Sequence, residues 1–158
     1  MANTQSMCTS FMGELLTATH NFGTAPTRGT STADTFKAAL YLTTATVNAS
    51  TTAYSATNEV SGTNYTAGGV SISGWNAPTA TNASATAGTA FTTPTASITY
   101  TNVTLTTAFD CVLIYNSTQS NKAVSVHTFG SQTITAGTFT LTMPTNNTTN
   151  ALLRLSTT

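Results

Sequence analysis

Phe109-Asp110-Cys111-Val112-Leu113-Ile114-Tyr115 is the most continuously apolar run of this 158-residue chain. A short apolar run bounded by turn signals is typical of a strand that is buried on both faces. The residues that follow, 116–121, are rich in turn formers such as Asn and Ser. We therefore predict that 109–115 is the central strand of the fold.

Other apolar stretches predict further strands on either side of this run. In 97–106 the apolar positions change parity between Tyr100 and Val103, which predicts a β-bulge at Thr101-Asn102. Residue Phe91 marks a weak edge strand in a low-complexity stretch, and 51–60 predicts one helical turn. The remaining predicted strands cover 36–42, 70–74, 124–129, 139–143 and 152–155. Seven or eight short strands with almost no helix between them predict an antiparallel sandwich or barrel. Of the two we expect an all-β antiparallel β-sandwich, jelly-roll or Ig-like.

The N-terminal segment has helical periodicity. Met7, Phe11 and Leu15 are spaced four residues apart, and Leu16 lies on the adjoining track, so 6–19 predicts a short helix with one apolar stripe. We expect residues 1–20 to form a helical arm and 21–158 a single β-sandwich domain. The stripe has two interpretations: it covers an open end of the domain's own core, or it grips a neighbouring subunit.

Charge is scarce in this chain. Charged residues make up 5% of the sequence and the formal net charge is zero, whereas an ordinary domain carries about a quarter charged residues. The scattered Lys and Arg residues predict no binding to nucleic acid, which requires clustered cations. The sequence has no apolar run long enough for a membrane span and no signal-peptide pattern at its start. We therefore expect synthesis in a cytoplasm, where the two cysteines are reduced thiols.

Two Cys and two His residues make up the ligand set of a structural zinc site. However, Cys8 and His20 are twelve residues apart and Cys111 and His127 are sixteen apart, without a close ligand pair. The second pair also suggests a Cys–His nucleophile, but Cys111 lies in the most apolar strand, where burial disfavours the thiolate. We expect no metal, no cofactor and no catalytic residue.

The acidic residues support the same expectation. Asp110 is predicted to lie at a strand end, where Lys122 or a backbone N–H would be its partner. A glycosidase-like pair of Glu59 and Asp110 is compatible with the sequence, but no motif supports it.

The block Asn58-Glu59-Val60-Ser61-Gly62-Thr63-Asn64-Tyr65-Thr66-Ala67-Gly68-Gly69 has the composition of a structured loop. The carboxylate of Glu59 is expected to accept backbone N–H bonds and so to fix the loop. Tyr54 and Tyr65 can bury their rings while their hydroxyls reach polar partners. Gly68 and Gly69 allow the positive φ that reverses the chain.

This block, together with Phe36-Lys37-Ala38-Ala39-Leu40-Tyr41 and Ala53-Tyr54, resembles a family of small structural proteins of tailed bacteriophages. Its members have a strand of the form K-x-A-L-Y, followed by Y-x-x-x-N-E-V-x-G-x-x-Y-x-x-G-G. The later stretches 112–116, 129–130 and 151–155 are similar to the closing strands of that family, so the resemblance covers most of the chain. It implies a virion component without enzymatic activity.

The function expected from this resemblance and from the composition is capsid cement or decoration. Such a protein binds the major capsid protein across joints between subunits, on the capsid surface of the virion, and we expect it to associate with itself as a homotrimer. The alternative is a structural component of the tail, the head–tail connector or a fibre. The residues expected to make contacts are Met7, Phe11, Leu15, Leu16, Glu59, Asn64, Tyr65 and Trp75. For each of them the alternative is a purely internal role, in the core or in a plain turn.

Overall fold

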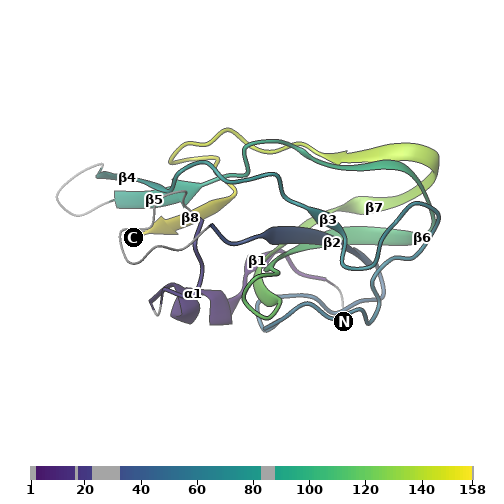
Figure 1. Ribbon diagram of the computed structural model, residues 1–158, viewed down its shortest axis with the longest axis horizontal. Helices are drawn as coiled ribbons and strands as arrows, with labels where there is room; N and C mark the ends of the chain where they lie inside the picture. Colours follow the sequence, from purple (N-terminus) through teal and green to yellow (C-terminus); the bar gives the residue numbers. More distant parts are fainter. Residues whose placement is uncertain (1–2, 17, 23–32, 83–87, 158) are drawn as a thin grey trace.

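The computed structural model describes residues 3–16, 18–22, 33–82 and 88–157. Within these residues it contains two antiparallel sheets and one short helix (Figure 1). The elements are β1 (Ser6–Met7), α1 (Thr9–Leu16), β2 (Phe36–Leu42), β3 (Val70–Ser71), β4 (Thr79–Asn82), β5 (Gly88–Thr92), β6 (Ile98–Asn116), β7 (Lys122–Leu141) and β8 (Leu153–Ser156). The predicted all-β antiparallel sandwich class is confirmed.

A long hairpin of β6 and β7 dominates the larger sheet. The strand order in this sheet is β1-β7-β6-β2-β3, so β6 lies in the interior with β7 and β2 as its neighbours. The predicted central strand 109–115 is the second half of β6, and its residues Cys111 to Tyr115 are all buried. The separate strands predicted at 97–106 and 109–115 are one strand in the structure, and those at 124–129 and 139–143 are also one strand.

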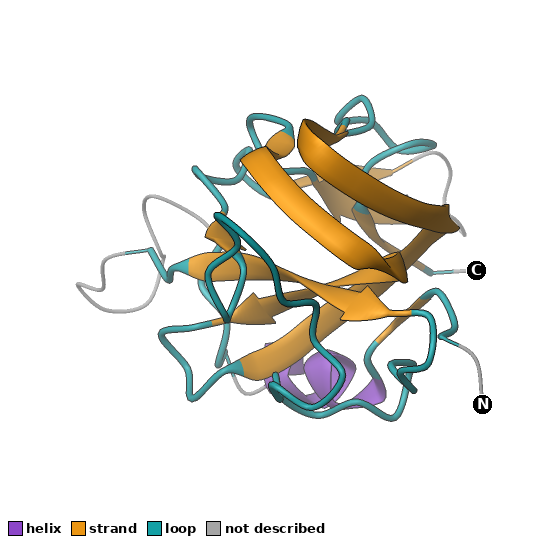
Figure 2. Cartoon of the chain, turned by 90° about the vertical axis from the view of Figure 1, so that its right-hand side faces the viewer, coloured by secondary structure: helices purple, strands orange, loops and turns teal. Residues whose placement is uncertain are grey.

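The hairpin is continuous but bent. The register between β6 and β7 shifts repeatedly between Tyr100 and Cys111, and Asn102 has a φ of 51°. These shifts include the bulge predicted at Thr101-Asn102, and bulges bend a strand and increase its twist. Tyr100, directly before the first shift, donates a hydrogen bond of 2.8 Å to the carbonyl oxygen of Ala38 in β2. Figure 2 shows the resulting layers of strands, with the helix beneath them.

The smaller sheet has the strand order β4-β5-β8. The low-complexity stretch around Phe91 predicts only a weak edge strand, but β5 is the central strand of this sheet and pairs with both neighbours. Leu153 of β8 is 5% exposed and belongs to the common hydrophobic core. The two sheets therefore bury their apolar side chains in one core.

The described part of the N-terminal segment pairs with β7 and packs against the hydrophobic core. The predicted helix over 6–19 is shorter in the structure, because Ser6 and Met7 pair with β7 as strand β1. After α1, Ala18 adopts a φ of 54° and the N–H of Thr19 bonds the carbonyl of Glu14 at 2.9 Å. A left-handed residue of this kind ends a helix. The division into a helical arm, 1–20, and a single β-sandwich domain, 21–158, stays a prediction.

The helical turn predicted over 51–60 is absent from this described stretch. It forms turns and isolated bridges instead, of which Ala53 with Lys122 and Glu59 with Tyr41 are two. The prediction failed because these residues find backbone partners on neighbouring strands. The one described helix has eight residues, too few to cross a membrane.

Candidate functional site

Residues 58–69 form the structured loop that their composition predicts. Asn58 has a φ of 60°, and its carbonyl accepts a hydrogen bond from the N–H of Leu42. The next residue, Glu59, forms a bridge with Tyr41, and the N–H of Val60 bonds the carbonyl of Leu40. The start of the loop is therefore held along the edge of the β2 strand.

The carboxylate of Glu59 ties the loop together. Its Oε1 accepts hydrogen bonds from the hydroxyl of Tyr65 at 2.7 Å and from the N–H of Gly68 at 2.8 Å. Its Oε2 accepts a hydrogen bond of 2.6 Å from the hydroxyl of Tyr54. The predicted backbone bond to Glu59 is thus confirmed. Three donors from both ends of the segment 54–68 converge on this one side chain.

All five tyrosines of the chain lie around Glu59. Tyr54 stacks on Tyr115 with ring centroids 4.7 Å apart, and Tyr65 stacks on Tyr100 at 5.9 Å. Burial raises the pKa of Tyr65 and of Tyr54 above the usual range, and the hydrogen bonds to Glu59 raise both further. Burial also raises the pKa of Tyr115 to about 12. The phenols therefore remain protonated donors at neutral pH.

Two glycines close the loop against the sheet. At Gly69, φ is 70° and a Cβ would collide with the carbonyl oxygen of Ala38. A Cβ at Gly62 would collide with the carbonyl oxygen of Thr104. A side chain would not fit at either close approach, and the left-handed φ of Gly69 also favours glycine. The loop therefore lies directly on β2 and β6.

The outer surface of the loop is neutral and polar. Residues 61–64 and 66–67 are exposed and carry hydroxyl, amide or small side chains. Asn64, with a φ of 61°, donates a hydrogen bond of 2.8 Å from Nδ2 to the carbonyl of Asn102. Beside the loop, a recess of about 260 Å³ is lined by residues that include Tyr41, Ser55 and Asn58, none of which is charged.

The other predicted contact residues lie apart from this loop. Phe11 is 2% exposed and Trp75 is 9% exposed, and both contact Phe22, with ring centroids at 5.9 and 4.8 Å. Met7 and Leu15 are half-buried and pack against the same core. The side chain of Leu16 lies outside the described part. Of the predicted site, the structure therefore brings together Glu59, Asn64 and Tyr65, whereas the apolar members belong to the core or its border.

Trp75 has an unusual environment for a core residue. Its indole ring is packed edge-on against Phe22 and Phe36. Its buried Nε1–H has no hydrogen-bond partner within the described part of the chain. The ring therefore contributes through packing.

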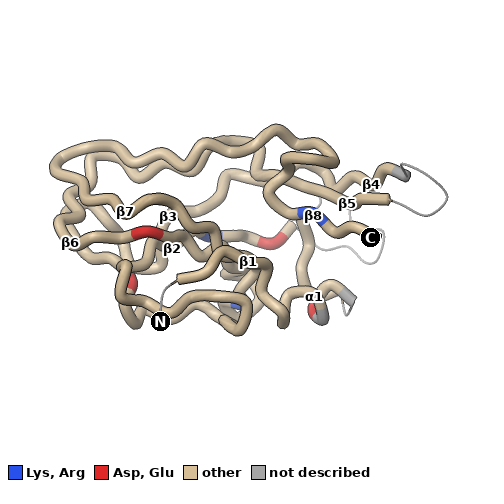
Figure 3. Tube along the Cα trace, turned by 180° about the vertical axis from the view of Figure 1, so that it is seen from behind, with Lys and Arg blue, Asp and Glu red and all other residues tan. Residues whose placement is uncertain are grey.

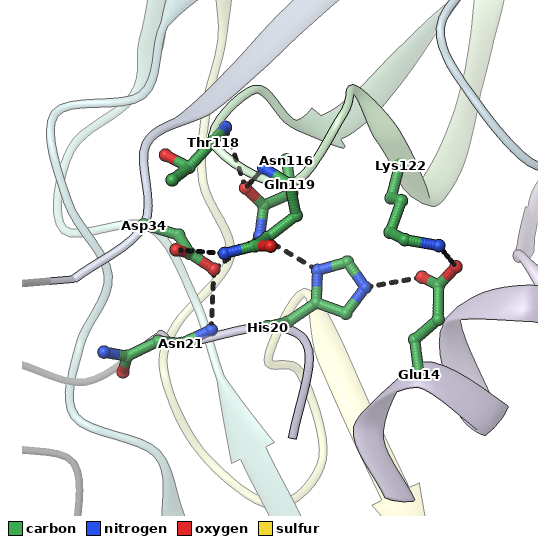
Figure 4. Close-up of polar contacts among 8 residues, drawn as sticks. All are labelled: Glu14, His20, Asn21, Asp34, Asn116, Thr118, Gln119 and Lys122. Atoms are coloured by element: carbon green, nitrogen blue, oxygen red, sulfur yellow. Dashed lines mark hydrogen bonds and ion pairs between the residues drawn. The ribbon is translucent and has the colours of Figure 1, made fainter. Parts of the chain in front are cut away.

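A second polar network, which sequence reasoning missed, fastens α1 to the β6–β7 turn (Figure 4). Oε2 of Glu14 lies 2.7 Å from Nε2 of His20, and Oε1 lies 2.6 Å from Nζ of Lys122. Burial alone would raise the pKa of Glu14, but the hydrogen bonds from Lys122 and His20 and the charge of Lys122 outweigh it and lower this pKa below 4.5. Lys122 thus pairs with Glu14 and not, as one alternative had it, with Asp110.

The other side of the buried His20 ring is held by Asn116. Nδ2 of Asn116 lies 3.0 Å from Nδ1 of His20 and donates a hydrogen bond of 2.7 Å to Oδ2 of Asp34. Oδ1 of Asn116 accepts the N–H groups of Thr118 and Gln119, both at 3.1 Å. These contacts fix the orientation of the amide, so Nδ1 of His20 accepts a hydrogen bond from Asn116 and Nε2–H donates to Glu14.

The cysteines and the second histidine have the properties of core groups. Burial raises the pKa of Cys8 to about 11 and that of Cys111 to about 12, so both are thiols at neutral pH. Burial lowers the pKa of His127 to about 4, and its Nε2 lies 2.9 Å from the Oγ of Ser125. The described residues contain no group of three or more His, Cys, Asp or Glu that could hold a metal ion.

Asp110 also has a structural partner. Its Oδ1 accepts a hydrogen bond of 2.7 Å from Nδ2 of Asn3. The same amide group donates to the carbonyl of Leu42 at 3.1 Å. Asp110 therefore anchors the N-terminal segment, while Glu59 holds its own loop.

A scan against protein-family models and searches of curated proteins and of solved structures found no match to this chain.

Proposed function

We propose that this protein is a structural component of a bacteriophage virion, and specifically a cement or decoration protein on the capsid surface. It binds the major capsid protein across joints between neighbouring subunits and stabilises the head. The resemblance of the Asn58–Gly69 block to small structural proteins of tailed phages supports this role. The environment of the charged groups supports it as well.

The observation that carries the proposal is the state of the four carboxylates in this chain. Each of them accepts hydrogen bonds from the protein's own groups: Glu14 from His20 and Lys122, Asp34 from Asn21, Asn116 and Gln119, Glu59 from Tyr54, Tyr65 and Gly68, and Asp110 from Asn3. Figure 3 shows the charged residues as isolated points on an otherwise neutral trace. Such a surface favours attachment through shape, hydroxyls and amides over attachment through charge.

The loop held by Glu59 is the proposed contact surface. Its exposed residues 61–64 lie on a backbone that is fixed by the Glu59 hydrogen bonds and by the close approach of Gly62 to Thr104. A preorganised loop loses little conformational freedom when it binds, which leaves more of the interaction free energy for affinity. We propose that each copy presents this loop to a capsid subunit.

Several weak contacts made at once would add up to tight attachment. When one contact forms, it raises the effective concentration of the next. Self-association as a homotrimer around local threefold positions would supply three such loops in one closed unit, in line with the closed symmetry of most oligomers.

The copy number in purified virions tests this role. Quantitative mass spectrometry should give a ratio to the major capsid protein near one, or a fixed large fraction of it. A few to tens of copies per particle would instead assign the protein to the tail, the head–tail connector or a fibre. Absence from the virion would overturn the proposal.

A pair of variants tests the contact surface. Ser61→Arg places a long cation on the exposed loop and should abolish attachment to particles, with an unchanged melting temperature. Thr149→Arg, at an exposed position in another part of the chain, is the matched control and should still attach. Raising the salt to about 1 M, where the Debye length is ~3 Å, should release little wild-type protein. Wholesale release in high salt, or attachment of Ser61→Arg, would contradict this contact surface.

A further inference from the structure

The outer half of the β6–β7 hairpin has one covered edge and one free edge. On the β6 side, the N–H of Thr104 bonds the carbonyl of Thr63 at 3.1 Å, so the loop 58–69 lies along this edge. On the β7 side, β1 pairs with β7 only as far as Val126. Among the described residues, no strand, isolated bridge or backbone hydrogen bond joins the outer side of β7 over 133–141 (Figure 1). This stretch is therefore a free sheet edge.

The free edge lacks the protection that isolated edge strands usually have. Natural edge strands are guarded against further pairing by charged residues or Pro. The stretch 133–141 contains no Asp, Glu, Lys, Arg, His or Pro. Its half-buried side chains pack against the core, namely Ile134, Phe139 and Leu141. Its threonines are exposed, namely Thr133, Thr135, Thr138 and Thr140.

Bulges can also protect an edge, but they do not reach the end of this strand. Ala136, with a φ of 47°, lies before the last five residues of β7. The three pairs that join 98–100 to 139–141 follow one another without a shift of register. The end of β7 therefore has the regular extended geometry that the addition of another strand requires.

This edge is complementary to itself. Its exposed side chains carry hydroxyls and no charge, so they offer no specific partner to a charged or a strongly apolar segment. Two such edges can pair antiparallel about a two-fold axis without bringing like charges together, and Thr opposite Thr is a favourable cross-strand pair. The hairpin already contains such a pair, because Oγ1 of Thr99 lies 3.4 Å from Oγ1 of Thr140. The zero net charge of the chain also removes long-range repulsion between copies.

We infer that two copies of this chain associate by antiparallel pairing of the segments 137–141, about a two-fold axis at Phe139. This register places Thr138 of one copy opposite Thr140 of the other and joins the two larger sheets into one. A two-fold contact gives an even number of copies, whether it acts alone or together with the threefold association proposed above. The inference does not depend on the virion role, and it uses a different part of the chain from the loop 61–64.

The mass of the purified protein in solution tests the inference. Analytical ultracentrifugation from about 1 μM to about 1 mM should show an assembly with an even number of copies. A monomer at every concentration, or a trimer or other odd assembly, would overturn the two-fold contact. The experiment needs no particle, so its result is independent of whether the protein is found in virions.

Hydrogen exchange locates the contact in the wild-type protein. The outward amides of 137–141 should exchange at least tenfold more slowly at the highest concentration than at the lowest, because the second copy supplies their hydrogen-bond acceptors. The inward amides of the same stretch already bond β6 and serve as the internal control. Protection that appears only on other surfaces would overturn the inference.

A pair of double variants tests the register. Thr138→Lys with Thr140→Lys places like charges opposite each other twice and should weaken association about tenfold at low salt. Thr138→Lys with Thr140→Glu is the matched control at the same positions. It places opposite charges face to face and should associate at least as tightly as the wild type. Equal weakening of the two variants would overturn this register, and undiminished association of the first would overturn the contact itself. Both substituted side chains face solvent, so both variants should fold, which circular dichroism checks.

Discussion

The hydroxyl of Tyr65 lies 2.7 Å from Oε1 of Glu59 and 3.0 Å from the backbone nitrogen of Leu40. It therefore donates to the carboxylate and accepts from the central sheet at the same time. This single side chain couples the loop to β2, which explains how a loop with a neutral, exposed surface keeps a fixed position.

Removing this hydroxyl should cost more stability than removing that of Tyr54. Tyr65→Phe leaves the Leu40 N–H without its acceptor and Glu59 with one donor fewer, so we expect a loss of about 2–4 kcal/mol. Tyr54→Phe removes one donor to Glu59 alone and should cost about 1–2 kcal/mol. Urea unfolding of the two variants measures both values. Equal losses would show that the bond to Leu40 contributes nothing.

The side-chain amide of Asn116 should also be required for full stability. Asn116→Asp would replace its Nδ2 donor with a carboxylate oxygen next to Oδ2 of Asp34, which is now 2.7 Å away. Two like charges in a buried site repel, so the variant should lose about 2–4 kcal/mol at neutral pH. The loss should shrink in acid, where one of the two carboxyls is protonated. A pH-independent loss in thermal unfolding would contradict this explanation.

His127 should make the protein less stable as the pH falls from about 6.5 to about 4. Burial lowers its folded pKa from 6.5 to about 4, so between these values the unfolded chain binds a proton that the folded chain does not. The stabilisation is complete above 6.5 and is lost progressively toward 4. His127→Gln should remove this part of the pH profile in urea unfolding. An unchanged profile would show that the imidazole is accessible when folded.

Glu14 should act in a more acidic window. Its folded pKa is lowered below 4.5 by its partners Lys122 and His20, which outweigh the effect of burial. The stabilisation is therefore complete above 4.5 and is lost as the pH falls through the lower folded value. Glu14→Gln should flatten the profile below 4.5, while the part between 6.5 and 4.5 should be retained.

The apolar stripe of α1 should be divided between core and surface. Phe11 is 2% exposed and contacts His20 and Phe22, so Phe11→Ala should cost about 3–5 kcal/mol. Met12, on the same helix, is 47% exposed, and Met12→Ser should change stability by less than ~0.5 kcal/mol. Equal stability of Phe11→Ala and the wild type would mean that the N-terminal segment is an arm that does not contribute to the core.

Local patterns in the sequence determined the strand at 36–42, the buried run 109–115 and the bulge at 101–102, because alternation and turn residues act over a few neighbours. They also indicated that Glu59 would hold its loop, since its donors Tyr54, Tyr65 and Gly68 all lie within nine residues of it. These features therefore depend mainly on interactions between residues that are close together in the sequence.

Only the tertiary structure decided where elements end and which distant groups meet. Strand β6 continues through 107–108 because β7 pairs with it on both sides of this point, at Leu105 and at Phe109. Ser6 and Met7 leave the helical pattern because β7 offers them backbone partners. The contact of His20 with Asn116 joins residues 96 positions apart. Such a pair has no periodicity in the sequence, because it depends on how whole elements pack and on the requirement that buried polar groups be hydrogen-bonded.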